Sequence, residues 1–406
     1  MAAWRLTHRP RNWQREALSR WQKQGRSGIA QVVTGAGKTV LAELCILDFL
    51  EATPEGHIVI VVPTVALLDQ WYVDLQEDMG AIETDIATFS GGGRTARSAP
   101  INLMVLNTAR SEAPRLASEK PTLLIVDECH RAASTENAKA LRGNHAATLG
   151  LSATPERQYD EGLADVLKPA LGDIVFTYGY DDARRDGVIS DFVLVNVGVS
   201  LLPEEQALYD DLSKKIGPAV RAMKEGLDDG QRLRIALQKR AAVANRAAMR
   251  VPVSCWLADK HRGERTVIFH EEIAAAERIH QLLADSGQNV TLYHSRIAPA
   301  IRRDNLRLFR SGAFQSLVSC RALDEGMNVP ETAVGIIAAS TASTRQRIQR
   351  LGRLLRPAEG KRQATVYTLY ATEVEQKRLA EEAATLEAAS EVKWQEANTG
   401  VAKAFH

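Results

Sequence analysis

Cysteine, net charge and long apolar runs are all scarce in this sequence, and each scarcity excludes a class of protein. The four cysteines, at positions 45, 129, 255 and 320, are too far apart for a CxxC pair, which argues against a zinc module, an iron–sulfur cluster or a disulfide scaffold. The 51 Lys and Arg against 50 Asp and Glu leave a net charge of +1, so any polyanion must be held by local clusters of charge. No stretch approaches the roughly 20 apolar residues of a membrane span, and arginines stand where a signal peptide needs an apolar run. We therefore expect a cytoplasmic protein with no membrane partner.

Apolar runs of strand length recur along the chain in two series. At 406 residues the chain exceeds the usual domain size of about 100–200 residues, so we expect more than one domain. Because the runs are apolar throughout rather than alternating, they predict parallel strands covered on both faces. The first series begins at His57, Ile101, Thr122 and Ala147, and the second at Thr266, Val290, Ser316, Val334 and Ala364. The predicted fold class is α/β, with two similar parallel-sheet units.

A different pattern separates the two series. From Pro203 to about Arg262 the sequence indicates helices, with Pro203, Pro218 and Pro252 as expected first-turn residues, so we interpret this part as a helical insertion or linker. From Glu373 onward, helix formers of mixed charge predict a solvated terminal helix. The expected organisation is a first domain over 1–180, a linker and helical insertion over 181–262, a second domain over 263–372 and a helical tail over 373–406.

A glycine-rich turn lies between the apolar run IAQVV and the helix-like run VLAELCILDFL. Gly35 and Gly37 let backbone amides point inward around phosphate oxygens, while Lys38 can reach the β and γ phosphates. The Thr39 hydroxyl can ligate magnesium. The strict pattern GxxxxGK[ST] is not met, because Val32 stands at its first glycine, so an ordinary turn that carries a lysine is the alternative. The predicted phosphate loop comprises Thr34, Gly35, Ala36, Gly37, Lys38 and Thr39.

Two carboxylates follow the apolar run that begins at Thr122, in the segment TLLIVDECH. Ligands of parallel sheets usually bind at the carboxyl ends of the strands. Asp127 is suited to hold magnesium, commonly through water, and Glu128 to polarise an attacking water. Solvated acids at a strand end are the alternative. The gap between Lys38 and Asp127 accommodates a few strand–helix units, so both motifs can lie along the edge of one sheet.

The segments TGAGKT, DECH and LGLSATPER occur in this order, and with them nearly the whole chain resembles the superfamily-2 helicases and translocases. The resemblance implies two RecA-like domains in tandem, with ATP and Mg²⁺ in the cleft between them. It assigns Gln14 to the adenine edge, with Arg11 or Trp13 nearby for stacking; an amphipathic first helix with a core tryptophan is the alternative. Ser152 and Thr154 resemble the motif that couples the two halves. The family's nucleic-acid contacts correspond to Pro63, Thr64, Asn107 and Thr108.

An arginine-rich segment, QRIQRLGRLLRP, lies between the last two apolar runs of the second series. The resemblance assigns Arg353 and Arg356 as arginine fingers, because planar guanidinium forks spread positive charge over developing negative charge on phosphate oxygens. A solvated helix face is the alternative. The residues that match the family's QRxGRxxR motif are Gln349, Arg350, Gly352, Arg353 and Arg356.

The segment SCRALDEGMNVPE resembles the family motif that joins nucleic-acid contact to the nucleotide cleft, with Gly326 as its turn. Asn328 stands where an aspartate is frequent, so an amide replaces a charged contact. We expect His270 and His294 to be polar strand-end or backbone-contact residues, since no partner occurs at metal-ligand spacing.

The motifs are most similar to those of the branch that contains the repair helicase XPB and the motor subunits of restriction enzymes. This resemblance implies an ATP-dependent DNA helicase or translocase, with a nucleic-acid partner that is DNA in preference to RNA. An RNA helicase is one alternative, because the phosphate-loop and arginine motifs do not report the sugar. A nucleotide-gated nucleic-acid-binding subunit of a larger repair or defence assembly is the other. We find no nuclease cluster in the sequence, so a protein partner that supplies a nuclease or targeting function fits this interpretation.

Overall fold

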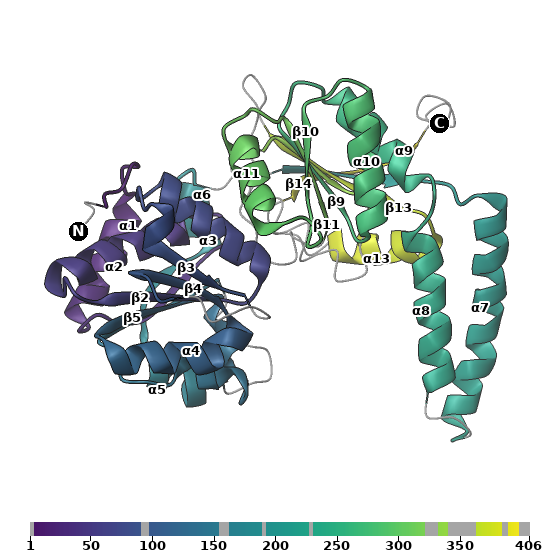
Figure 1. Ribbon diagram of the computed structural model, residues 1–406. Coiled ribbons are helices and arrows are strands. Elements are labelled where there is room, and N and C mark those ends of the chain that lie inside the picture. Colours follow the sequence, from purple (N-terminus) through teal and green to yellow (C-terminus); the bar gives the residue numbers. More distant parts are fainter. Residues whose placement is uncertain are drawn as a thin grey trace. The chain divides into compact units, whose positions relative to one another are not determined.

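The computed structural model describes residues 4–90, 97–153, 162–188, 192–226, 230–320, 332–339, 363–383 and 389–397. Its described residues form two compact units, which divide between Val188 and Phe192 (Figure 1). Each unit is built on a seven-stranded sheet in which every strand pairing is parallel. The predicted α/β class is therefore confirmed. Within the described residues, no helix is both long and apolar enough to cross a membrane.

The first unit has the strand order β3-β4-β2-β5-β6-β1-β7. The apolar runs that begin at His57, Ile101, Thr122 and Ala147 all form strands, as predicted. Its strands are β1 (Ser27–Val32), β2 (His57–Val62), β3 (Ile86–Phe89), β4 (Ile101–Val105), β5 (Thr122–Asp127), β6 (Ala147–Ser152) and β7 (Ile174–Tyr178). Its α-helices are α1 (Asn12–Lys23), α2 (Lys38–Ala52), α3 (Val65–Glu77), α4 (Leu106–Glu119), α5 (Lys168–Leu171) and α6 (Tyr180–Arg185).

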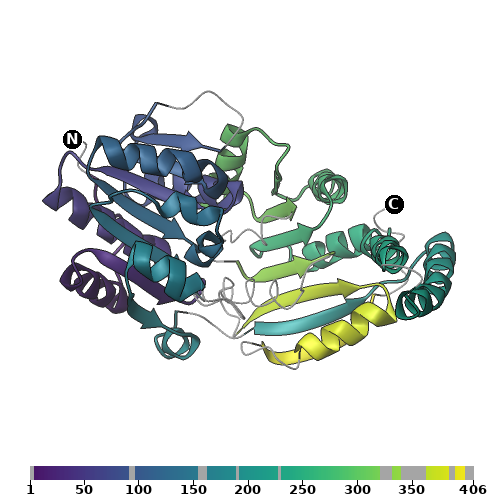
Figure 2. The ribbon, with the colours of Figure 1, turned by 90° about the horizontal axis from the view of Figure 1, so that it is seen from below.

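The continuous apolar pattern of these strands follows from burial on both faces. In β2, Ile58 and Ile60 pack in the core that contains Trp71 of α3. Val59 and Val61, which point to the opposite face, pack in the core that contains Ala109, Ala113 and Leu116 of α4. Figure 2 gives a second view of these layers. Both faces of the sheet are covered, and its carboxyl edge is left to the loops that carry the predicted motifs.

The second unit has the strand order β10-β11-β9-β12-β13-β8-β14. Every apolar run of the second series forms a strand, as predicted. Its strands are β8 (Phe192–Gly198), β9 (Thr266–His270), β10 (Val290–Tyr293), β11 (Ser316–Cys320), β12 (Val334–Ile337), β13 (Ala364–Tyr370) and β14 (Ala389–Glu396). Its helices include α7 (Pro203–Lys224), α8 (Gln231–Asn245), α9 (Arg250–Lys260), α10 (Ile273–Asp285), α11 (Pro299–Arg310) and α13 (Glu373–Ala383).

Helices α7 and α8 lie side by side as a long hairpin that projects from this unit (Figure 1). Pro203 occupies the first turn of α7, as expected, but Pro218 lies inside the helix, contrary to the prediction. The base of the hairpin is held by the Glu205 side chain, whose Oε1 accepts a hydrogen bond from the Ala248 amide at 2.9 Å.

Two elements differ from the sequence-based organisation. Strand β8, in the span interpreted as linker, pairs with β13 and β14 and so belongs to the second sheet. The span interpreted as a helical tail contains helix α13, but Ala389–Glu396 forms the edge strand β14. The reason is that an edge strand can alternate polar and apolar residues, as SEVKWQE does, without the continuous apolar signal of a central strand.

Candidate functional site

The predicted phosphate loop connects the end of β1 to the start of α2. Gly35 and Gly37 have φ values of +83° and +102°, a conformation that glycine adopts without the steric penalty of a side chain. Gly37 is the N-cap of α2, which begins at Lys38. The loop therefore presents a helix N-terminus at the carboxyl edge of the sheet, the arrangement that binds anions.

Gln14 is almost fully buried and joins α1 to this loop. Its Oε1 accepts a hydrogen bond from the Arg11 amide at 2.7 Å, and its Nε2 donates to the Gly37 carbonyl at 2.9 Å. Arg11 is exposed next to it. Trp13, by contrast, stacks on Tyr178 at 4.8 Å between ring centroids and is 5% exposed. The proposed stacking of a nucleotide on Trp13 is therefore wrong: this ring is a core residue, because its amphipathic helix turns it toward β7.

Lys38, Asp127 and Glu128 are brought together at the carboxyl ends of β1 and β5. The Lys38 Nζ lies 3.3 Å from Glu128 Oε1, although the two residues are 90 positions apart. Burial alone would lower the pKa of Lys38, but the neighbouring carboxylates of Glu128 and Asp127 outweigh it and raise the pKa. The ammonium group is therefore charged throughout the physiological range and is available to neutralise an anion.

Asp127 has a hydrogen-bond donor on each carboxylate oxygen. Trp71 Nε1 donates to Oδ2 at 3.0 Å, and the Glu128 amide donates to Oδ1 at 2.9 Å. Burial raises the pKa of Asp127, while Lys38 acts in the opposite direction. Trp71 is not among the site residues expected from the sequence. The available signal was a tryptophan two turns after Pro63 and Thr64, in the segment VPTVALLDQW.

Glu128 lies in the left-handed region, with φ +48° and ψ +48°, which is uncommon for a residue other than glycine. Its Oε2 lies 3.4 Å from His130 Nδ1, and the same nitrogen lies 3.0 Å from the Ser152 hydroxyl at the end of β6. His130 thus joins the acidic segment to the segment predicted to couple the two halves, a role that the sequence analysis did not assign. Burial and the two adjacent carboxylates raise the pKa of Cys129 to about 12, so this neighbour is a neutral thiol. Thr154 lies outside the described residues.

The predicted nucleic-acid contacts lie at the same edge. Pro63 and Thr64 follow β2. Asn107 and Thr108 lie in the first turn of α4, which follows β4, the parallel neighbour of β2. Thr64 is the N-cap of α3 and its Oγ1 accepts a hydrogen bond from the Leu67 amide at 3.3 Å. The Asn107 side chain is exposed.

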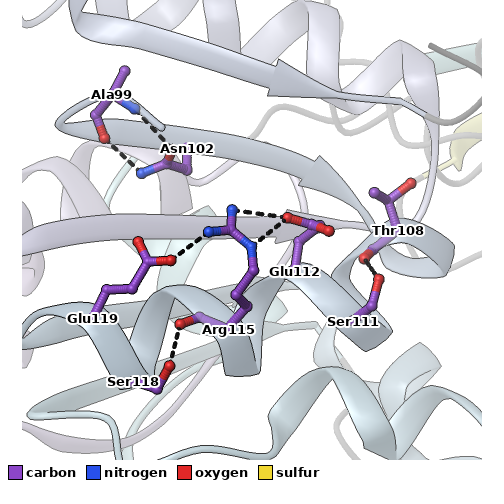
Figure 3. Close-up of polar contacts among 8 residues, drawn as sticks. All are labelled: Ala99, Asn102, Thr108, Ser111, Glu112, Arg115, Ser118 and Glu119. Carbon is purple, nitrogen blue, oxygen red and sulfur yellow. Dashed lines mark hydrogen bonds and ion pairs between the residues drawn. The ribbon is translucent and has the colours of Figure 1, made fainter. Parts of the chain in front are cut away.

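Thr108 lies on α4, whose surface residues form local hydrogen bonds and ion pairs. The Thr108 carbonyl accepts a hydrogen bond from the Ser111 hydroxyl at 3.3 Å (Figure 3). One turn further, Arg115 bridges Glu112 and Glu119 (Figure 3). Thr108 therefore lies in the first turn of α4, and these surface contacts follow it along the helix.

Thr39 and Asp127 are oxygen donors of the kind that Mg²⁺ prefers. Within the described residues there is no group of three or more His, Cys, Asp or Glu that could hold a metal ion by itself. Mg²⁺ usually binds through one or two carboxylates together with substrate phosphates and waters. The buried Asp127 carboxylate beside the loop fits this pattern.

In the second unit, the two histidines are strand-end residues, as expected. The Nδ1 of His270 accepts a hydrogen bond from the Glu272 amide at 3.0 Å, and the Nδ1 of His294 accepts one from the Arg296 amide at 3.2 Å. Burial, with a contribution from Arg250, lowers the pKa of His270 to about 4. Several residues predicted from the second half of the sequence lie outside the described residues, namely Gly326, Gln349, Arg353 and Arg356.

Comparison with known proteins gives matches along most of the chain. Residues 7–157 match the family model described as type III restriction enzyme, res subunit, and residues 248–358 match the helicase conserved C-terminal domain. The chain is 30% identical over 364 residues to the DNA 3'-5' translocase XPB2 of Sulfurisphaera tokodaii, covering 85% of this chain and 78% of that protein. It is 24% identical to the DNA 3'-5' helicase XPB of Mycobacterium tuberculosis, covering 89% of this chain and 60% of that protein.

The fold is also found among solved structures. The structure of Saccharomyces cerevisiae Dbp5 bound to RNA and ADP BeF3 matches with a TM-score of 0.64 at 14% identity, covering 96% of this chain and 90% of that chain. At this identity the likeness shows the two-domain RecA-like fold alone. The sequence matches go further, because they cover both halves of the chain. The chain belongs to the superfamily-2 helicases, nucleic-acid-dependent ATPases, in the branch that contains XPB-like helicases and the motor subunits of restriction enzymes.

Proposed function

We propose that the protein is an ATP-driven DNA helicase or translocase that moves in the 3'-to-5' direction. The observation that carries the proposal is the meeting of Lys38, Asp127 and Glu128 at one sheet edge, with Lys38 Nζ 3.3 Å from Glu128 Oε1. DNA and the 3'-to-5' direction are supported by the names of the XPB-like relatives. The chain spans 78% of the Sulfurisphaera relative and about half, 54%, of Rad25 of Haloarcula marismortui.

The ion pair suggests how nucleotide binding prepares hydrolysis. Without phosphate, the Lys38 ammonium neutralises Glu128. Phosphate oxygens would compete with Glu128 for the Lys38 ammonium group. Once Lys38 binds phosphate instead, the Glu128 carboxylate would be able to accept a proton from water. Backbone amides of the 34–39 loop would hold the phosphates, and the Arg11 side chain, beside the buried Gln14 amide, would lie against the base.

Magnesium fits this site through Thr39 and Asp127. When bound, the ion would neutralise charge on the phosphate oxygens. Asp127 is held by Trp71 and by the Glu128 amide, so its orientation is set by the protein. We also propose that Arg353 and Arg356 stabilise negative charge on the transferred phosphoryl group, with Gln349 and Gly326 belonging to the same machinery.

The strand would contact Pro63, Thr64, Asn107 and Thr108 through its backbone. Such contacts do not read bases, so binding should depend little on sequence. Lys and Arg contacts to the backbone would add a salt dependence: for single strands the slope of log affinity against log salt is about −0.7 per neutralised phosphate, so four to six contacts from charged side chains would give roughly −3 to −4. A protein partner that supplies a nuclease or targeting function is part of this proposal, since movement along a strand does not itself cut or select DNA.

The test is ATPase activity against a panel of single- and double-stranded DNA and RNA, with Lys38→Ala as the inactive control. We expect stimulation by single-stranded DNA, and displacement of a duplex strand from a 3' overhang rather than a 5' overhang. Stimulation by RNA alone would favour an RNA helicase. Tight nucleotide-dependent binding of DNA without stimulated turnover would favour a gated binding subunit.

A further inference from the structure

Trp71 is a buried core residue whose polar atom is used at the candidate site. The indole is 0% exposed and packs in the core with Leu67, Leu68 and Leu75. A buried indole N–H normally finds an acceptor. Here the acceptor is the Oδ2 of Asp127, at 3.0 Å, rather than a backbone carbonyl.

This bond fixes the direction of the Asp127 carboxylate. The Glu128 amide donates to Oδ1 at 2.9 Å, so the two donors hold one oxygen each. A carboxylate oxygen can accept more than one hydrogen bond, so both oxygens keep capacity toward water or a metal ion. Unlike Lys38, the indole adds a donor without adding a charge. It therefore orients Asp127 and does not neutralise it.

Trp71 is also joined to a predicted nucleic-acid contact by a single helix. Thr64 is the N-cap of α3, and its carbonyl accepts a hydrogen bond from the Leu68 amide at 3.1 Å. Trp71 follows Thr64 by seven residues, which is about two helical turns and roughly 10 Å along the axis, on nearly the same face. A helix is stiff over this length, so a movement of its first turn moves the indole as well.

We propose that Trp71 is a positioning residue that couples strand contact at Pro63 and Thr64 to the orientation of Asp127. This inference rests on the proposed function, because it takes Asp127 as the residue that holds Mg²⁺ and Thr64 as a strand contact. It goes further by assigning the route between the two: from Thr64, through the first two turns of α3, to the indole N–H and the carboxylate.

The chain provides a matched control for this bond. Trp21 is also buried, at 1% exposed, and its Nε1 donates to the Thr148 carbonyl at 2.8 Å, away from the loop and the carboxylates. Trp71→Phe and Trp21→Phe therefore remove the same group from the same core. A purely structural role predicts similar losses of thermal stability and no other difference between the two variants.

The measurement is the affinity for ATP, taken as the affinity for a non-hydrolysable ATP analogue, by calorimetry over a series of Mg²⁺ concentrations, with and without oligothymidylate. In Trp71→Phe we expect the Mg²⁺ concentration for half-maximal gain in ATP affinity to rise by roughly tenfold, because partners that orient metal-binding groups have effects of this size. The factor by which the oligonucleotide changes ATP affinity should fall toward one. By linkage, ATP should lose its effect on oligonucleotide affinity to the same extent. Trp21→Phe should leave these quantities within about twofold of wild type.

Identical Mg²⁺ and oligonucleotide responses in the two variants would overturn the proposal and leave Trp71 as a core residue. Wild-type protein that binds ATP with no dependence on Mg²⁺ would instead contradict the proposed function itself.

If Trp71→Phe does not fold, the indole N–H signals of the six tryptophans in NMR spectra decide the question. Asp127→Asn should shift one of these signals, and oligothymidylate should shift the same signal in the wild-type protein. The absence of an indole signal that responds to both would also overturn the proposal.

Discussion

Lys38 and Glu128 form one ion pair, but their replacement should have different effects. Lys38→Ala removes the charge that would meet the phosphates, so ATP affinity should fall at least about tenfold, since hydrogen bonds to charged groups are worth about 1.5–3 kcal/mol. Glu128→Gln keeps the shape of the side chain and removes the base, so affinity should stay near wild type while turnover falls by about 10²–10⁴. Nucleotide titration and steady-state turnover with saturating single-stranded DNA separate the two effects.

An exposed pair in the same unit supplies the control for this comparison. Lys139 and Glu136 lie 2.9 Å apart on the surface. Lys139→Ala should change neither nucleotide affinity nor turnover, because an exposed ion pair contributes little. Wild-type turnover in Glu128→Gln would remove Glu128 as the base.

The lowered pKa of His270 predicts that the free energy of unfolding depends on pH. Burial, with Arg250 nearby, lowers its pKa to about 4, against about 6.5 in an unfolded chain. Between these values the unfolded state binds the proton more readily, so stability present above about pH 6.5 is lost as the pH falls toward 4. The loss from this one group should be about 2 kcal/mol between pH 7 and pH 5.

His270→Asn tests that loss, because an amide oxygen can accept the Glu272 amide hydrogen bond in place of Nδ1. Urea unfolding at the two pH values should show a smaller decrease in the free energy of unfolding for the variant. An equal decrease in both proteins would show that other groups govern this pH range.

At the scale of elements, the phosphate loop and α1 are held together by one glutamine. A Cβ added at Gly37 would lie 2.8 Å from Gln14 Nε2, at a φ of +102°. Gly37→Ala should therefore strain the loop and displace Gln14, and ATP affinity should fall at least about fivefold, the equivalent of one hydrogen bond of about 1 kcal/mol.

Gly80→Ala is the matched control, since Gly80 also has a positive φ, +73°, with nothing within 4 Å of an added Cβ. Both variants should lose about 1–2 kcal/mol of stability from backbone strain, as measured by urea unfolding. Only Gly37→Ala should lose nucleotide affinity. If both variants bind ATP like wild type, the Gln14 contact does not support the loop.

The elements differ in how well the sequence predicts them, for physical reasons. The strands β2 and β5 are buried on both faces, so their sequences are continuous apolar runs that are readily identified. Strand β14 lies at an edge and mixes charged with apolar residues, which made it similar to the helix-forming segment before it. Strand β8 directly precedes a helical hairpin, so its position in the sequence suggests a linker, although its partners in the sheet are β13 and β14.

The residues of the candidate site also differ in how well the sequence predicts them. The glycine loop and the acidic strand end are local patterns, and both were found where the sequence predicted them. The roles of Gln14, Trp71 and His130 depend on hydrogen bonds to Gly37, Asp127 and Ser152, which lie 23, 56 and 22 residues away in the sequence. A local sequence pattern does not indicate partners at such distances. The resemblance supplied a role for Gln14 alone. Trp13 illustrates the opposite error, because a residue beside a motif was given a function that its burial in the core excludes.

At the scale of the whole molecule, the two family matches fall in different units. Residues 7–157 belong to the first unit, and residues 248–358 belong, where they are described, to the second. The phosphate loop and both candidate acids are in the first unit, whereas the arginine motif is in the second part of the sequence. Turnover should therefore depend on residues from both parts of the chain.

Arg353→Lys and Arg356→Lys test that dependence, because lysine keeps the charge but lacks the planar fork. We expect near-normal ATP binding and a decrease of at least roughly a hundredfold in DNA-stimulated hydrolysis, since loss of an arginine finger costs about 10³–10⁵ in related sites.

Arg115→Lys is the control: this arginine is 41% exposed on α4, where it bridges two glutamates, and its replacement should leave turnover unchanged (Figure 3). Adding Arg353→Lys to Glu128→Gln should cause little further loss, because residues that serve one transition state need not act additively. Wild-type hydrolysis by both arginine variants, measured with saturating single-stranded DNA, would show that the arginine motif takes no part in the reaction.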